Sequence, residues 1–126
     1  VFLQSAQQEM FNIAGELSAP EFKSVDEKKV TSIEKFIDQV NDNLPPLKEF
    51  IVPGEEIRSA HTHMARAICR RAERSLVKLS KERSINPFSL KYLNRLSDAF
   101  FVIARLLARE SSENETLWKH ERVKKE

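Results

Sequence analysis

Three observations predict an all-α protein, an antiparallel bundle of helices. The chain has 126 residues, the length of one compact domain with a single hydrophobic core. Apolar residues recur at spacings of three and four along most of it. It contains only two glycines and five prolines, and Gly15 and Gly54 are too far apart for a glycine-rich phosphate loop. β-Sandwich, Rossmann and P-loop folds are therefore excluded.

Two amphipathic patterns occupy the first part of the chain. Over residues 2–18 the apolar residues lie along one stripe of a helix, and Pro20 follows its end. A second helix is expected to start at a capping box formed by Ser24 and Glu27. Its stripe is the most regular in the sequence and comprises Val30, Ile33, Ile37, Val40, Leu44 and Leu47.

A proline pair ends the second helix and starts a connecting segment. Pro45 and Pro46 lack the backbone N–H groups that a helical turn needs, so the helix is expected to stop near Asn43. The chain should then run extended through Phe50 to a turn at residues 53–54.

Two longer helices are expected in the second part. An unbroken helical pattern covers residues 55–81. Asn86 followed by Pro87 is typical of an N-cap with proline in the first turn. The stripe of this last helix comprises Leu93, Leu96, Phe100, Ile103 and Leu107.

The C-terminal residues differ in composition from the bundle. Residues 111–126 are polar and basic and carry no apolar stripe, so we expect them to fray, apart from an anchor at Trp118. The bundle domain is assigned to residues 1–110. No apolar stretch approaches the roughly 20 residues that cross a bilayer. Cys69 has no partner for an intramolecular disulfide, which favours a reducing compartment: the cytoplasm, or the mitochondrial matrix in a eukaryote.

The net charge of +2 hides an uneven distribution. Residues 1–56 carry five lysines and eleven acidic residues, a balance of −6. Residues 57–126 carry sixteen basic and eight acidic residues, a balance of +8. The second half is therefore expected to bind an anion.

Two of the predicted helices carry a compact polar stripe as well as an apolar one. At 100° per residue, the side of the third helix expected to face the core holds Ile57, Met64, Ile68, Ala72 and Leu79. Its other side collects His63, Arg66, Arg70, Glu73 and Arg74. A polar face of the last helix holds Asn94, Asp98, Phe101 and Arg105. Such faces can build a site between helices or between subunits.

Three interpretations of the arginines are open. A solvated face, with Arg66, Arg70 and Glu73 paired at helical spacings, is the more frequent outcome for an isolated charged helix. A polyphosphate site is the second, because guanidinium forks match phosphate oxygens. A nucleic-acid surface is weaker, since Glu73 and Asp98 would repel the phosphate backbone. His63 taken alone is more often a packed or surface residue.

Three segments resemble the PduO-type ATP:cob(I)alamin adenosyltransferases. They are LPPLKEFIVPG at 44–54, HMARAICRRAER at 63–74 and YLNRLSDAFFVIAR at 92–105, in the family's order and with connections of fitting length. The resemblance extends over nearly the whole chain, to about Arg109. It implies a five-helix, ferritin-like bundle, of which four helices are visible here, and a homotrimer with active sites between subunits.

The resemblance also implies the reaction. The 5′-deoxyadenosyl group of ATP, bound with Mg²⁺, moves to the cobalt of the substrate cob(I)alamin, and tripolyphosphate leaves. No protein-only metal site and no nucleic-acid or membrane partner are implied, and hand-over to a cobalamin-dependent enzyme is expected. The alternative is a non-catalytic phosphate- or nucleic-acid-binding module that uses the arginine face, or a degenerate bundle that keeps the trimer without turnover.

Residue roles follow from the same resemblance. Catalytic roles fall to Phe50, Arg66 and Arg70. ATP contacts are assigned to Arg66, Arg70, Glu73, Arg74 and Asn94. Interface or supporting positions are Arg71, Arg95 and Asp98. Corrinoid contacts are assigned to Phe50, His63 and Phe101. Phe50 matches an aromatic residue beneath the corrin ring that excludes the lower axial ligand, whereas the residues alone favour an ordinary hydrophobic side chain after a turn.

The chain departs from the family pattern at two places. The family's threonine-, glycine- and aspartate-rich phosphate loop and its first helix do not lie in this sequence, which opens on Val1. We therefore expect the natural N-terminus to be longer. Glu55 stands where the family has a second glycine, and a carboxylate there is expected to alter the turn near the corrinoid.

Overall fold

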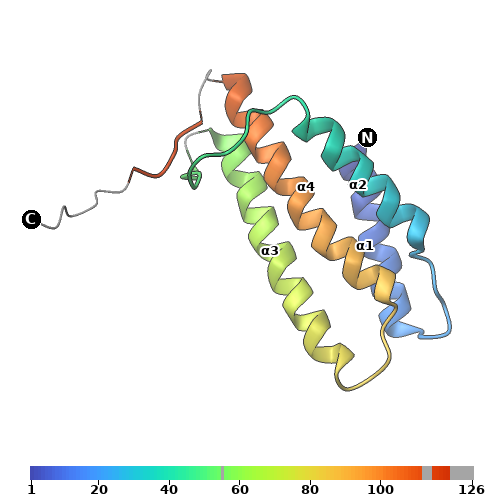
Figure 1. Cartoon of the computed structure of the whole chain (residues 1–126). Coiled ribbons are helices and arrows are strands. Elements are labelled where there is room, and N and C mark those ends of the chain that lie inside the picture. The colour runs from blue at the N-terminus through green and yellow to red at the C-terminus, as the bar shows by residue number, and fades with distance from the viewer. Residues whose placement is uncertain (55, 112–114, 120–126) are drawn as a thin grey trace, which may run out of the picture.

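The computed structural model confirms an all-helical bundle. It describes residues 1–54, 56–111 and 115–119. The helices are α1 (Phe2–Ser18), α2 (Glu27–Asn41), α3 (Ile57–Ser80) and α4 (Pro87–Ser111). The chain runs up and down, α3 lies antiparallel to α4, and α4 also packs against α2 (Figure 1). Within the described ranges, no helix is long and apolar enough to cross a membrane.

One helix start differs from its predicted cap. Asp26, and not Ser24, caps α2, and its side chain accepts a hydrogen bond from a first-turn backbone N–H at 3.1 Å. Ser24 lies outside the helix because its backbone N–H donates to Glu16 Oε1 at 2.6 Å. Asn86 caps α4 as predicted, since its Oδ1 accepts a hydrogen bond from the backbone N–H of Phe88 at 3.0 Å.

A buried carboxylate joins α1 to the start of α4. Glu16 is 7% exposed and accepts hydrogen bonds from the backbone N–H groups of Ser24 and Val25, the amide of Asn86 and the hydroxyl of Ser89. Burial alone would raise the pKa of Glu16, but these hydrogen bonds, with that from Ser89 the strongest, outweigh burial and lower the pKa. The carboxylate therefore stays ionised while it ties three segments together.

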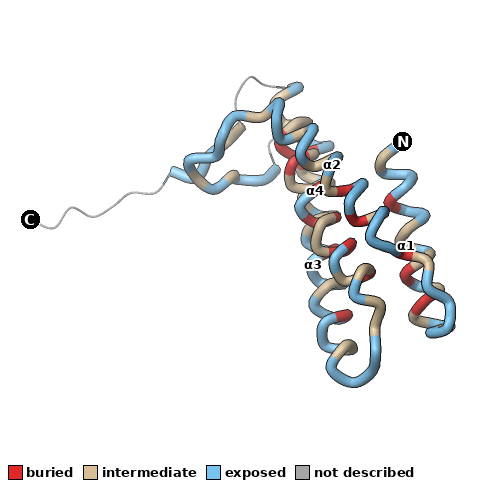
Figure 2. The backbone as a smooth tube through the Cα atoms, turned by 45° about the vertical axis from the view of Figure 1, so that its right-hand side comes forward, coloured by how far each residue is buried: buried red, intermediate tan, exposed pale blue. Residues whose placement is uncertain are grey.

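The core lies where α4 meets its neighbours, and Figure 2 shows the buried residues concentrated on the facing sides of the helices. The expected core stripe of α3 is wrong, because Ile57, Met64 and Ile68 are 71%, 60% and 54% exposed. Ala72 is exposed as well, and Leu79 is half-buried.

The physical reason is the rotation of α3 about its own axis. The residues of α3 that are buried against α4 include Cys69 and Leu76, at the border between the polar and apolar stripes. Because α3 packs against α4 with this border, its polar stripe and its apolar stripe both stay on the surface of the chain. Burial raises the pKa of the Cys69 thiol to about 11, so this cysteine is a packed residue and not a nucleophile.

The C-terminal segment also differs from the expectation of a frayed tail. Ile51 and Leu117 form an antiparallel bridge, which joins the tail to the segment between α2 and α3. Trp118 is anchored as expected, with its ring centroid 5.9 Å from that of Phe50. Fraying was wrong for residues 115–117, because backbone pairing and a buried ion pair at Glu115 hold them.

Candidate active site

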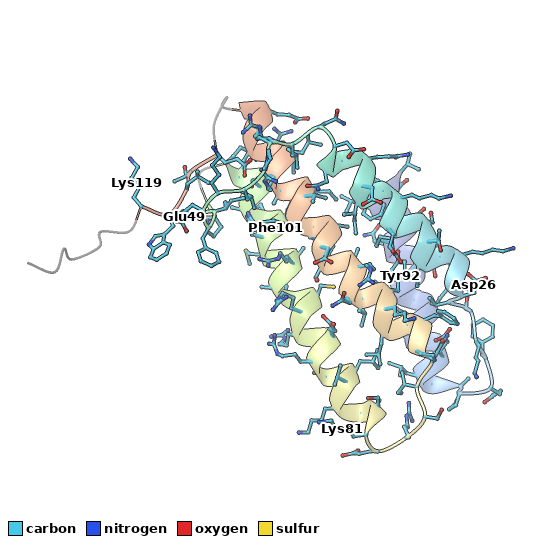
Figure 3. All side chains as sticks on the ribbon, viewed as in Figure 1. Asp26, Glu49, Lys81, Tyr92, Phe101 and Lys119 are labelled. Atoms are coloured by element: carbon cyan, nitrogen blue, oxygen red, sulfur yellow. The ribbon has the colours of Figure 1, made fainter. Side chains whose placement is uncertain are left out.

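A cavity of about 510 Å³ opens between the connecting segment and the helices α3 and α4. Figure 3 labels one lining residue on each side of it, Glu49 of the connecting segment and Phe101 of α4. Its lining comprises Leu47, Lys48, Glu49, Phe50, Ile51, Pro53, His63, Arg66 and Phe101. Folding thus brings together four of the predicted site residues, from three segments that are far apart in the sequence. The extended segment predicted after the proline pair is what places Phe50 there.

Phe101 organises the inner wall of the cavity. The guanidinium carbon of Arg66 lies 4.9 Å from the centroid of the Phe101 ring, a cation–π contact. The ring of His63 meets the same ring edge-on, with centroids 6.4 Å apart. Burial, and then the charge of Arg66, lowers the pKa of His63, so the imidazole is neutral near pH 7.

Phe50 forms the outer edge of the cavity. Its side chain is 74% exposed, so it is not a core residue. A large exposed aromatic ring costs hydration free energy unless a ligand or partner covers it. The wall built from Phe50, His63 and Phe101 is therefore suited to a flat, largely apolar ligand.

Glu73 and Asn94 form a hydrogen-bonded network that links helices. Asn94 Nδ2 donates to Glu73 Oε2 at 2.9 Å, and Arg95 Nη1 donates to Asn94 Oδ1 at 2.6 Å. Arg95 also approaches Glu34 of α2, with Nε and Oε1 3.8 Å apart. The network fixes the amide of Asn94 relative to α3, while the second hydrogen of Nδ2 has no acceptor within the described ranges.

The hydrogen bond between Glu73 and Asn94 argues against a solvated face on which the arginines pair with Glu73. Glu73 uses its carboxylate on Asn94, and within the described residues it forms no ion pair with Arg66 or Arg70. The ion pairs with Glu73 that would offset the charges of the arginines are therefore absent from the described residues. The stripe remains a set of accessible cations, as an anion site requires.

Four predicted site residues lie outside both the cavity and the network of Glu73, Asn94 and Arg95. Arg70, Arg71, Arg74 and Asp98 are exposed. None of them has an ion-pair partner among residues 1–54, 56–111 and 115–119. Their assigned roles stay predictions. Residue 55, where a carboxylate replaces the expected glycine, lies outside the described residues, whereas Gly54 before it adopts a φ of 116°, which favours glycine.

Sequence reasoning placed Arg105 on the polar face of the last helix but missed its burial and its partner Glu115. The side chains of Arg105 and Glu115 are each 4% exposed and form an ion pair, with Arg105 Nε and Glu115 Oε2 3.0 Å apart. Arg105 Nη2 also donates to the carbonyl oxygen of Pro45 at 2.7 Å. The available signal was an arginine inside the apolar run VIARLLA, where a charge needs a buried partner.

Comparison with known proteins agrees with this geometry. The family profile described as cobalamin adenosyltransferase matches residues 1–107. A cobalamin adenosyltransferase of Cupriavidus metallidurans is 40% identical over 116 residues, which cover 92% of this chain and 63% of that protein. A corrinoid adenosyltransferase of Bacillus subtilis is 40% identical over 109 residues, covering 83% and 56% respectively. The chain thus spans less than two thirds of the length of these relatives.

A solved structure extends the likeness to the fold. A variant PduO-type ATP:corrinoid adenosyltransferase from Lactobacillus reuteri, complexed with cobalamin and ATP, aligns with a TM-score of 0.83 at 34% identity. The alignment covers 94% of this chain and 68% of that one. Because the profile match, the relatives and the fold agree with the motifs at 44–54, 63–74 and 92–105, the chain belongs to the cobalamin adenosyltransferase family.

Proposed function

We propose that this chain forms part of an enzyme that transfers the 5′-deoxyadenosyl group of ATP to the cobalt of cob(I)alamin, giving adenosylcobalamin and tripolyphosphate. The observation that carries the proposal is the cavity itself, where aromatic walls adjoin the first arginine of an accessible cationic stripe. A corrin macrocycle matches the walls and a polyphosphate matches the stripe. The Lactobacillus reuteri relative that shares the fold is complexed with both ligands.

This reaction requires that the two substrates be positioned and that the negative charge on the leaving tripolyphosphate be stabilised. The electron pair of cobalt(I) attacks C5′ of the ribose, a cobalt–carbon bond forms, and the C5′–O bond breaks with its electrons on tripolyphosphate. No protein nucleophile is needed, so fixed cations that meet the developing charge account for much of the catalysis. We assign this role to Arg66 and Arg70, with Arg74 further along the stripe and Mg²⁺ carried by ATP.

The remaining residues act through placement. Phe50 lies against the corrin face and excludes the lower ligand of cobalt, which eases reduction of cob(II)alamin. Neutral His63 and Phe101 complete the apolar wall. Asn94 offers its second amide hydrogen to the nucleotide, and Glu73 holds that amide in place. Because a carboxylate would repel triphosphate, Glu73 contributes to ATP binding as a positioning residue.

The surface of α3 supports a homotrimer with sites between subunits. Ile57, Met64 and Ile68 form an exposed apolar stripe that a neighbouring subunit would cover. Arg71, Arg95 and Asp98 are supporting residues at or near that interface. A second recess of about 550 Å³, between α1, α3 and α4, is lined mainly by apolar side chains and would receive the family's first helix. Sedimentation equilibrium of the full-length protein should give a trimer, and a monomer would contradict it.

The product suggests a partner enzyme, and the unpaired thiol of Cys69 is typical of a reducing compartment. Adenosylcobalamin is a cofactor for other enzymes, so hand-over to a cobalamin-dependent enzyme is part of the proposal. We place the protein in the cytoplasm, or in the mitochondrial matrix of a eukaryote.

The test uses the full-length protein, MgATP and chemically reduced cob(I)alamin. We expect the cob(I)alamin spectrum to convert to that of adenosylcobalamin, with one tripolyphosphate released per cobalt. Arg66→Ala should abolish most of this activity, while Lys78→Ala, on the same helix outside the motif, should retain it. ATP binding without a cobalt–carbon bond would favour the non-catalytic phosphate-binding module instead.

A further inference from the structure

We propose that residues 115–118 position the Phe50 side of the cavity, and that the Arg105–Glu115 ion pair is the fixed point of this arrangement. The inference rests on the proposed function, because it concerns how the corrinoid side of the site is held. Arg105 and Glu115 are positioning residues, since both act through the connecting segment and neither lines the cavity.

The first step is the buried ion pair that joins the start of residues 115–118 to α4. Glu115 Oε1 accepts from Arg105 Nη2 at 3.1 Å, and Arg109 approaches the same oxygen, with Nη1 3.5 Å away. Removing two charges from water is costly, and a buried pair is best explained where it fixes one arrangement of the chain. Since Arg105 also binds the carbonyl of Pro45, one guanidinium holds the tail and the start of the connecting segment together.

The second step is the backbone pairing beyond that point. Val52 N–H donates to the carbonyl oxygen of Thr116 at 2.9 Å, and Trp118 N–H donates to that of Phe50 at 2.7 Å. These hydrogen bonds flank the bridge that pairs the tail with the connecting segment (Figure 1). The tail therefore supplies regular backbone partners to the residues on either side of the cavity's outer edge.

The third step is the aromatic contact at the end of the tail. The rings of Phe50 and Trp118 lie at 53° to each other, and the Trp118 side chain packs beside a ring that is otherwise exposed. Without this support, Phe50 would sit on an irregular segment with many accessible rotamers. Ordering it at each binding event would weaken corrinoid binding, while the arginine stripe on rigid α3 would be unaffected.

The chain offers a direct reporter, because Trp118 is its single tryptophan. In the full-length protein, Glu115→Ala should shift Trp118 emission to longer wavelength and increase its quenching by acrylamide, provided no other tryptophan lies in the complete sequence. Glu115→Gln, which keeps one acceptor but loses the charge, should fall between the parent and the alanine variant. Glu82→Ala, at an exposed residue in the turn between α3 and α4, is the matched control and should change nothing.

The functional readout separates the two substrates. With cob(II)alamin as probe, Glu115→Ala should weaken binding about tenfold and reduce the four-coordinate fraction seen by magnetic circular dichroism. The KM for ATP should stay within about twofold of the parent value, since the arginine stripe is intact. Should Glu115→Ala fail to fold, Trp118→Ala leaves the ion pair in place and should show the same selective loss.

Each outcome decides one claim. Unchanged Trp118 emission and unchanged cob(II)alamin affinity in Glu115→Ala would overturn the positioning role, as would equal losses for both substrates. A parent protein that binds cob(II)alamin but never forms a cobalt–carbon bond would overturn the proposed function, while the affinity and emission measurements would still test the segment. A parent that binds no corrinoid would overturn both.

Discussion

Two buried charged groups hold opposite ends of the bundle, and they do so in different ways. Glu16 is surrounded by neutral donors, namely two backbone N–H groups, an amide and a hydroxyl. Arg105 instead pairs with the opposite charge of Glu115 and reaches the carbonyl of Pro45. The first group joins helices to each other, and the second joins two irregular segments to a helix beside the cavity.

The difference separates stability from function. A group that joins helices contributes to every state of the folded chain, so its removal should lower the free energy of unfolding. A group that orders a segment at the site contributes most when the ligand is bound. The predictions below test this division, from the largest expected effect to the smallest.

The largest effect is expected for Glu16→Ala. It leaves the donors of Asn86 and Ser89 without their acceptor, and should lower the free energy of unfolding by about 3 kcal/mol. Urea denaturation followed by circular dichroism measures this. The KM values of the remaining folded protein should be unchanged. Glu21→Ala, an exposed residue a few positions on, is the control, and equal losses for both variants would remove Glu16 from its structural role.

The next effect concerns the cationic stripe. Arg70 is exposed, so Arg70→Ala should leave the urea midpoint unchanged. A charged hydrogen bond to phosphate is worth roughly 1.5–3 kcal/mol, which predicts a loss of about 10- to 150-fold in kcat/KM for ATP. Corrinoid affinity should be retained. Kinetic constants equal to those of Lys78→Ala would place Arg70 on a solvated face.

Phe50→Ala should have a smaller and more selective effect. Unfolding should be unaffected, because the side chain is 74% exposed. Starting from cob(II)alamin, we expect more of the five-coordinate form and slower adenosylation. Starting from cob(I)alamin the loss should be smaller, and ATP affinity should be unchanged. An unaltered four-coordinate signal with unaltered turnover would exclude Phe50 from the site.

The sequence predicted the helices and part of the cavity for definite reasons. The periodicity of apolar residues located four helices, and the adjacent residues Pro45 and Pro46 located the segment that carries Phe50. Family motifs selected His63, Arg66 and Phe101, which the fold brings together. Which side of α3 faces α4 could not be read from periodicity, because Ile57 and its neighbours form an apolar stripe that the single chain leaves exposed.

The buried charges were harder to foresee. Glu16 lies in an ordinary amphipathic pattern, and only the fold brings the loop after α1 and the start of α4 to its carboxylate. Glu115 lies in a polar tail where nothing in the sequence distinguishes it from its neighbours. Such groups are fixed by contacts between distant segments, and residue spacing along one helix carries no information about them.

The smallest predicted effect is a dependence of stability on pH that belongs to Glu16. Its pKa in the folded chain is lowered from an ordinary value of 4.5, so its stabilising contribution is complete above that value and is lost as pH falls through the folded pKa. Urea midpoints of the parent should therefore fall more steeply between pH 5 and about pH 3 than those of Glu16→Gln, which has no carboxylate to protonate. Glu21→Gln serves as the control and should follow the parent. Parallel pH profiles for the parent and Glu16→Gln would show that the four donors do not favour the ionised carboxylate. Glu16 could then not be described as a buried charge held by neutral donors, in contrast to the Arg105–Glu115 ion pair.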